Sequence, residues 1–194
     1  MNSILEYDTT LFLFLNNLGN ETWDGFWLTL SGTYTALPLY VLLLFLSLKE
    51  FGIKSTLLLL LLVAVMITGT DQLANAFKYG TERLRPCHEE TLVGHIRLVK
   101  ATCGGKFGFF SAHAANTAAL ATFFSLLFVP YYRFIPALLI LWALLVAYSR
   151  IYIGVHYPLD VITGISIGML AGWLFYILKN KLEVRLWKNR KAQI

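Results

Sequence analysis

The chain has 194 residues, of which 57% are hydrophobic and only 14% are charged, and its mean hydropathy is +0.63. In soluble domains roughly a quarter of the residues are charged, so this composition argues for an integral membrane protein built as one domain. The net charge of +5 does not indicate nucleic-acid binding, because the basic residues gather at the ends of apolar runs and near the C-terminus. Basic residues in those places set the topology of a membrane protein.

The first apolar segment, residues 4–24, is too short and too often interrupted by polar residues to cross a bilayer. We expect it to form an amphipathic helix that lies on the membrane surface, and a sixth crossing is the alternative. Its start carries neither a basic stretch nor a small-residue cleavage site, so no removable signal peptide is expected.

Five apolar runs follow, and each is long enough for a crossing of roughly 20 residues. They cover residues 23–48, 55–77, 111–129, 134–154 and 158–179. The predicted fold is an all-α polytopic membrane bundle of about five transmembrane helices, a single domain over residues 1–194. Gly164, Gly168 and Gly172 recur every four residues on the last helix. They predict close helix packing, either within the bundle or between two chains as a homodimer.

Five crossings place the N-terminus, the loop of residues 78–110 and the turn of residues 150–156 on one side of the membrane. The opposite side holds nine of the sixteen Lys and Arg residues. By the positive-inside rule, the basic tail of residues 180–194 is cytoplasmic and the 78–110 loop is extracytoplasmic. We therefore expect a multi-pass protein of the cell (inner) membrane with this loop on its outer face.

The outward loop contains both cysteines of the chain, Cys87 and Cys103. An outward position exposes them to an oxidising compartment, where disulfides form and persist. A bridge between them would close a loop and stabilise the protein by about 3 kcal/mol. Two free thiols are the alternative.

Three groups of polar residues fall on the outward side, at the ends of the apolar runs. Lys78 ends the second run, Arg85 follows in the loop, and Arg150 lies near the end of the fourth run. Ser111 and Ala112 begin the third run, where a helix N-terminus offers unpaired backbone N–H groups and a positive dipole end. Three cations, a hydroxyl and a helix N-terminus predict a site for a tetrahedral oxyanion such as phosphate.

Two histidines adjoin this predicted anion site. His156 and Asp160 are four residues apart, so they share one face of a helix that begins near Pro158. A carboxylate bonded to one ring nitrogen raises the basicity of the other, which makes His156 a candidate nucleophile that forms a phospho-histidine. His113, on another helix, is the candidate acid that protonates the leaving oxygen. The cations already offset the charge of the transition state, so we expect no metal ion or cofactor.

These residues resemble the signature of the type 2 phosphatidic acid phosphatase family of membrane phosphatases. Its first motif, a lysine followed after six residues by Arg-Pro, matches Lys78 to Pro86. Its third motif, Ser-Arg, five residues, His, three residues and Asp, matches Ser149 to Asp160. Its second motif is Pro-Ser-Gly-His, and residues 110–113 read Phe-Ser-Ala-His. The alanine keeps the backbone N–H but adds a methyl group where the chain approaches phosphate.

The resemblance implies a metal-independent lipid phosphatase whose active site faces outward. It carries the family's roles onto the matching residues: phosphate binding by Lys78, Arg85, Ser111 and Arg150, acid catalysis by His113, nucleophilic attack by His156, and orientation of that histidine by Asp160. Bacterial members act on undecaprenyl diphosphate, phosphatidylglycerophosphate, phosphatidate or lipid A phosphates. The outward site and the additional basic residues favour undecaprenyl diphosphate.

Two other functions stay open. A lipid phosphotransferase of the same family would pass the phosphoryl group from His156 to an alcohol instead of water. A lipid-binding or lipid-transporting protein would use the cationic pocket without catalysis, but it would need neither the pair of His156 and Asp160 nor a second histidine.

Further charged residues lie near the predicted site. Asp71 falls within the second apolar run, where an acid is costly and usually has a partner. It is expected either to support Lys78 or to form a structural hydrogen bond. The remaining loop cations are expected to be solvated, with contact to a second phosphate as the alternative: Arg83, Arg97, Lys100 and Lys106.

Overall fold

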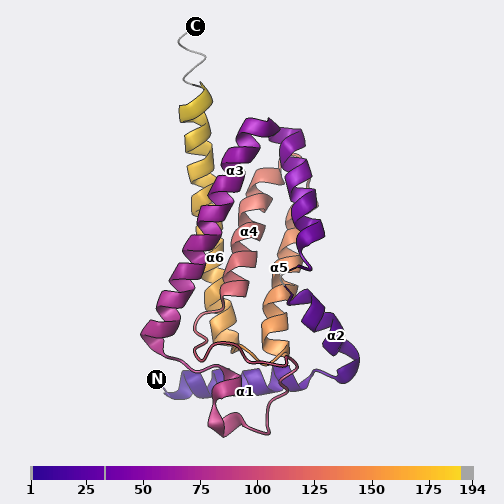
Figure 1. The fold of residues 1–194 in the computed structure, drawn as a ribbon, viewed down its shortest axis with the longest axis vertical. Helices are drawn as coiled ribbons and strands as arrows, with labels where there is room; N and C mark the ends of the chain where they lie inside the picture. The colour runs from indigo at the N-terminus through magenta and orange to yellow at the C-terminus, as the bar shows by residue number, and fades with distance from the viewer. Residues whose placement is uncertain (1, 33, 189–194) are drawn as a thin grey trace.

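The computed structural model of the protein describes residues 2–32 and 34–188. In chain order the helices are α1 (Asn2–Asn17), α2 (Glu21–Leu30), α3 (Leu37–Thr81), α4 (Ala112–Phe128), α5 (Ile135–Tyr152) and α6 (Pro158–Glu183). Helices α3 to α6 run along the long axis of the molecule, and α1 lies across one end of them (Figure 1). The predicted all-α fold is confirmed.

Helix α3 is a hairpin of two arms (Figure 1). Gly52 interrupts its helical geometry with φ 71° and ψ 173°, a conformation that costs glycine little because it has no Cβ. The chain reverses there, so that residues 37–51 and residues 53–81 both run along the bundle. This glycine lies in the stretch where the sequence predicts the turn between the first two crossings.

The first predicted crossing, residues 23–48, is wrong as a single helix. The structure divides it into α2 and the first arm of α3, and the described residues between Leu30 and Leu37 form turns. Gly32 weakens a helix, and Pro38 fits only the first turn of a new one, so a helix ends before this stretch and another begins after it.

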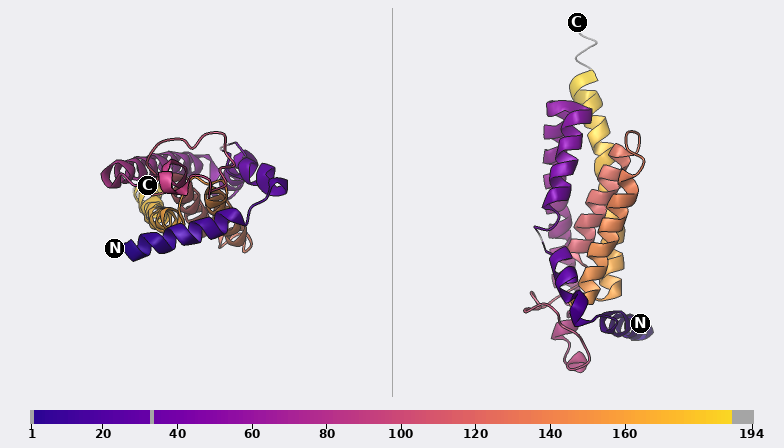
Figure 2. Two further views of the ribbon diagram at one scale, coloured as in Figure 1. Left: turned by 90° about the horizontal axis from the view of Figure 1, so that it is seen from below. Right: turned by 90° about the vertical axis from the view of Figure 1, so that its right-hand side faces the viewer.

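By length and composition, three helices of the described chain can cross a membrane, namely α3, α5 and α6 with its continuation to Leu186. The two arms of α3 supply two segments, and α4 is a shorter apolar helix of 17 residues. Together these helices confirm the predicted polytopic bundle. Viewed from below, α1 crosses the end of the bundle as the predicted interfacial helix would (Figure 2, left). The side view shows α6 extending beyond the other helices at the opposite end (Figure 2, right).

The predicted basic tail, residues 180–194, is only partly described. Helix α6 continues through Glu183 and ends in a turn of π-helix over Val184–Lys188. Residues 189–194 lie outside the described part of the chain. The predicted cytoplasmic position of this tail stays a prediction.

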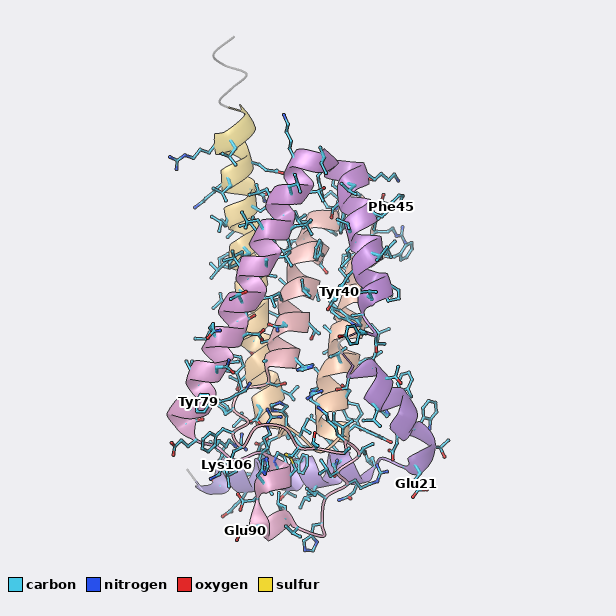
Figure 3. The ribbon with its side chains drawn as sticks, viewed as in Figure 1. Glu21, Tyr40, Phe45, Tyr79, Glu90 and Lys106 are labelled. Carbon is cyan, nitrogen blue, oxygen red and sulfur yellow. A yellow bond between two sulfur atoms is a disulfide. The ribbon has the colours of Figure 1, made fainter. Side chains whose placement is uncertain are left out.

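The loop between α3 and α4 folds over the end of the bundle that carries α1, and Glu90 and Lys106 mark it in Figure 3. It contains two short 3-10 turns, Pro86–His88 and Glu90–Leu92. Cys87 and Cys103 form a disulfide with their Cα atoms 6.0 Å apart. The predicted bridge is confirmed, and it closes the loop beside the predicted anion site.

Helix α6 packs directly on the backbone of α4 through its glycine face. A Cβ built on Gly168 would overlap the carbonyl oxygen of Ala115, and Gly164 and Gly172 approach α4 almost as closely. The predicted close packing therefore occurs within the bundle. These contacts account for the three glycines within the bundle, and the alternative homodimer stays a prediction.

Replacing Gly168 with alanine should destabilise the protein, because the added methyl group would overlap backbone that cannot rotate away. We expect a loss of about 1–3 kcal/mol, measured by thermal unfolding in detergent. The matched control is Gly69→Ala in α3, where nothing lies within 4 Å of the new Cβ. There alanine should be neutral or stabilising by about 1 kcal/mol. Equal stability of the two variants would contradict the close packing of α4 and α6.

Candidate active site

A cavity of about 890 Å³ lies between the arms of α3, α4 and α5. One end is charged and adjoins the loop that covers the bundle. The rest is mainly apolar, with walls that include Leu43, Leu59 and Phe124. Tyr40, labelled in Figure 3, lies on the wall supplied by the first arm of α3. The cavity therefore joins a polar opening to an interior suited to hydrocarbon.

Six of the eight predicted site residues line this cavity: Lys78, Arg85, Ala112, His113, Arg150 and His156. The other two, Ser111 and Asp160, have no exposed surface and lie behind the wall. The structure thus brings the predicted groups from α3, the loop, α4, α5 and the start of α6 to one end of the bundle.

Ser111 caps the N-terminus of α4. Its Oγ accepts a hydrogen bond of 3.4 Å from the N–H of Ala114, and its own N–H donates to the carbonyl oxygen of Asp160 at 3.0 Å. The first N–H groups of a helix have no acceptor inside it, so those of Ala112 and His113 remain for an anion at the cavity wall. The methyl group of Ala112, which replaces the glycine of the family motif, borders the same space.

Arg85 is held by the backbone of the loop. Its Nε donates to the carbonyl oxygen of Phe107 at 3.2 Å, and its Nη1 lies 3.4 Å from that of Cys103. Cys103 is one end of the disulfide. The covalent closure of the loop therefore also fixes two acceptors that aim this guanidinium toward the cavity.

Arg150 lies in the last turn of α5, and only 5% of its surface is exposed. Its Nη1 donates to the Oγ of Ser31, in the turn after α2, and its Nε has no hydrogen-bond partner among the described residues. A buried donor without a partner costs about 1–3 kcal/mol. The Nε–H of Arg150 is therefore available to donate to an acceptor on a molecule bound in the cavity.

A tight turn joins Arg150 to His156. Gly154 adopts φ 85°, and the N–H groups of Val155 and His156 both donate to the carbonyl oxygen of Arg150, at 3.1 and 3.3 Å. A Cβ on Gly154 would meet the carbonyl oxygen of Arg97 at 2.7 Å. Glycine is required here by both its conformation and the close approach.

His156 and Asp160 face each other as predicted, although the contact is long. The Nδ1 of His156 lies 3.4 Å from the Oδ2 of Asp160 and forms no hydrogen bond. The same Oδ2 accepts a hydrogen bond of 3.0 Å from the N–H of Tyr157, which caps the start of α6. A small rotation of the imidazole would bring Nδ1 within hydrogen-bonding distance of this oxygen.

The pKa of His156 is lowered to about 4, mainly by burial of the side chain. The positive charges of Arg85 and Arg150 lower it as well, and Asp160 opposes the shift. The imidazole is therefore neutral near pH 7. A neutral ring nitrogen carries the lone pair that a nucleophile requires.

Arg83 is not predicted from the sequence as part of the site. The expectation that it is a solvated loop charge is wrong, because it is partly buried and forms ion pairs with Asp8 and Asp160. Arg97 likewise pairs with Asp24 at 3.0 Å. Asp8 is an acid in a largely apolar segment, which is the one signal in the sequence that could have pointed to a buried partner.

Lys100 and Asp71 also line the cavity. Asp71 accepts a hydrogen bond of 2.8 Å from the Nδ2 of Asn116, a contact that joins α3 to α4. The predicted structural hydrogen bond is therefore present. Asp71 and Asn116 also form a polar patch on the cavity wall, farther from the loop than the cationic end, and Gln72 and Asn75 extend this patch.

Relatives of known function carry the same fold. The model of the PAP2 superfamily matches residues 54–183. The lipid A 4'-phosphatase of Bacteroides thetaiotaomicron is 38% identical over 93% of this chain and 80% of its own length. The crystal structure of Aquifex aeolicus LpxE has a TM-score of 0.66 and 26% identity, and the match covers 86% of this chain and 93% of that one. The PAP2-type phosphatidylglycerolphosphate phosphatase of Bacillus subtilis has a TM-score of 0.72 at 20% identity, covers 93% and 88% of the two chains, and supports the fold alone.

The family match covers the part of the chain that carries the site. All eight predicted site residues, from Lys78 to Asp160, lie within residues 54–183. The first relative named above is matched over most of its length, so the likeness extends well beyond the motifs. The chain belongs to the PAP2 superfamily and is a membrane lipid phosphatase.

Proposed function

We propose that the enzyme removes a phosphate group from a phosphorylated glycolipid of the lipid A type, through a phospho-histidine on His156. The observation that carries this proposal is the shape of the cavity, which places cations, two histidines and a helix N-terminus at one end of an apolar chamber. Such a chamber suits a substrate with a phosphate at one end and hydrocarbon at the other.

In the first step, the phosphate oxygens bind Lys78, Arg85, Arg150 and the N–H groups at the start of α4. The Nε2 of His156 attacks phosphorus, the bond from phosphorus to the lipid oxygen breaks, and His113 gives that oxygen its proton. As the ring gains positive charge, its Nδ1–H turns to hydrogen-bond Oδ2 of Asp160, which lies 3.4 Å from Nδ1 in the structure, and the proton stays on the ring. The cations and N–H groups stabilise the charge of the transition state.

In the second step, His113 has become a base and takes a proton from water. The water oxygen attacks the phosphorus of the phospho-histidine, the bond to Nε2 breaks, and inorganic phosphate leaves. His156 is then neutral again and His113 is protonated for the next cycle. An alcohol in place of this water would make the enzyme a phosphotransferase.

Two observations favour a glycolipid as the substrate. The polar patch of Asp71, Gln72, Asn75 and Asn116 offers acceptors and donors to hydroxyl or amide groups next to the phosphate. The relative from Bacteroides thetaiotaomicron is named as a lipid A 4'-phosphatase. A plain polyprenyl chain has no groups for such a patch to bind.

Undecaprenyl diphosphate is the second candidate. Lys100 lines the cavity in addition to the three cations already assigned to the first phosphate. A fourth cation would offset the charge of a second phosphate group. Phosphatidylglycerophosphate also carries a second phosphate and a hydroxyl group, so the named relative is what favours the glycolipid over it. Phosphatidate carries neither group.

We place the active site on the outer face of the cell (inner) membrane. The disulfide between Cys87 and Cys103 lies at that end of the bundle, and disulfides persist in oxidising compartments. The described end of α6, with its continuation to Lys188, extends beyond the opposite end of the bundle and carries several basic residues, as the positive-inside rule requires of a cytoplasmic end.

His156→Ala should remove nearly all activity, because it deletes the group that is proposed to form the covalent intermediate. Purified protein in detergent, with EDTA present, should release phosphate from a lipid A-type phosphate faster than from undecaprenyl diphosphate, phosphatidylglycerophosphate or phosphatidate. The variant should be at least about 10³-fold slower. Release that needs an added metal ion, or that survives in the variant, would overturn the mechanism. A phosphorylated alcohol formed in place of phosphate would establish the transferase.

His113→Ala should slow the enzyme according to the leaving group. With a lipid substrate the alkoxide must be protonated as it leaves, so we expect a loss of about 10²–10⁴-fold. With p-nitrophenyl phosphate the leaving phenolate needs no proton, so the first turnover should still give a burst of p-nitrophenolate. Rapid-mixing absorbance measurements on both substrates test this. An equal loss for both leaving groups would show that His113 is not the acid.

A further inference from the structure

Arg83 occupies a defined position between three elements of the fold. Its Nη1 donates to the Oδ1 of Asp160 at 2.7 Å, and its Nη2 donates to the Oδ2 of Asp8 on α1. The guanidinium lies over the ring of Tyr157, 4.3 Å from the ring centre. The N–H of Gly108 donates to the backbone carbonyl of Arg83 at 2.8 Å, so the main chain is fixed as well.

Arg83 does not belong to the surface that substrate would contact. Neither Arg83 nor either of its two carboxylate partners lines the cavity. The cations that do line it come from other positions, namely Lys78, Arg85, Lys100 and Arg150. Any effect of Arg83 on catalysis must therefore pass through the residues that it touches.

Asp160 is the residue through which such an effect would pass. Its carboxylate has no exposed surface, and a buried carboxylate needs an opposite charge and hydrogen bonds to be tolerated. Arg83 supplies the charge at Oδ1, which leaves Oδ2 facing Tyr157 N–H and His156 Nδ1. The planar guanidinium binds two carboxylates in fixed directions, Asp160 through Nη1 and Asp8 through Nη2, a geometry that the single ammonium of lysine does not reproduce.

Asp8 connects the same network to the helix that lies across the bundle end. Its Oδ1 accepts a hydrogen bond of 2.8 Å from the N–H of Leu159, in the first turn of α6, while its Oδ2 binds Arg83. Only 7% of its surface is exposed. One side chain of α1 thus secures both the start of α6 and the cation that faces Asp160.

We propose that Arg83 is a positioning residue for catalysis, anchored by Asp8, that holds Asp160 in the orientation from which it aligns His156. The proposal rests on the proposed role of His156 as nucleophile. Helix α1 is then part of the active-site framework as well as a contact with the membrane surface.

The test uses Arg83→Gln and Arg83→Lys in the full-length protein purified in detergent. For Arg83→Gln we expect kcat to fall about 10²-fold, the loss that misplacing a catalytic group by about 1 Å can cause. KM should change less than about 2-fold, because the residue does not touch substrate. Arg83→Lys should recover part of kcat, since it restores the charge without the fork.

The matched control is Arg97→Gln. Arg97 comes from the same loop, pairs with an aspartate at 3.0 Å and lies over a tyrosine ring, but it does not touch Asp160. We expect the same order of change in unfolding temperature and no change in kcat. If both variants lose kcat equally, the effect is structural and the proposal is wrong. A raised KM at unchanged kcat would make Arg83 a substrate contact, which also overturns it.

A double-mutant cycle with Asp160→Asn isolates the pathway of the effect. If Arg83 acts through Asp160, adding Arg83→Gln to Asp160→Asn should cost much less than Arg83→Gln alone. Full additivity would refute the proposal. Should Arg83→Gln fail to fold, Asp8→Asn replaces it, because the asparagine can still accept from Leu159 N–H; an unchanged kcat there would equally refute the proposal. Full activity of His156→Ala would instead show that the proposed function had failed.

Discussion

The close contact between α4 and α6 is the constraint on which the site depends. The glycine face of α6 lets the two backbones meet, and the hydrogen bond from Ser111 N–H to the carbonyl of Asp160 joins their first turns. The N-terminus of α4 is where phosphate would bind, and the proposed catalytic pair, His156 and Asp160, lies at the start of α6 and in the turn before it. Any side chain on Gly164 or Gly168 would separate these two turns. Helix packing in the middle of the membrane therefore sets the geometry of a reaction at its surface.

The charged residues near the site lie on two sides of the cavity wall. On the cavity side, Arg85 and Arg150 make their hydrogen bonds to carbonyl and hydroxyl oxygens, which are neutral acceptors. Behind the wall, the carboxylates of Asp8 and Asp160 share Arg83. These two acids are thus held by a cation of their own, and Asp71, the one acid among the described residues that line the cavity, is bound to Asn116. This arrangement leaves a positive charge for an anionic substrate and keeps the carboxylate beside His156.

Most of the candidate site residues could be predicted from the sequence, because the sequence patterns that identify them are local. The spacing of Lys78 and Arg85, and of His156 and Asp160, identifies residues that a helix end or a short turn keeps together. The pairing of Arg83 with Asp8 could not be predicted, since 75 residues separate them and only the packing of α1 against α6 brings them together. The division of residues 23–48 into two helices was missed for the opposite reason, because apolar composition masked the local effect of Gly32 and Pro38.

That missed break is itself part of the site. A continuous helix over residues 23–48 would keep its backbone groups paired along its length and present only side chains to the bundle. The break instead brings Ser31 to the guanidinium of Arg150, and it places Leu30, Ser31, Gly32 and Ala36 on the cavity wall. Irregular backbone at membrane depth is tolerated where it lines a cavity or is buried in protein. The departure from regular helix thus follows from the need to open a polar chamber beside hydrocarbon, which is the requirement that a lipid phosphate imposes.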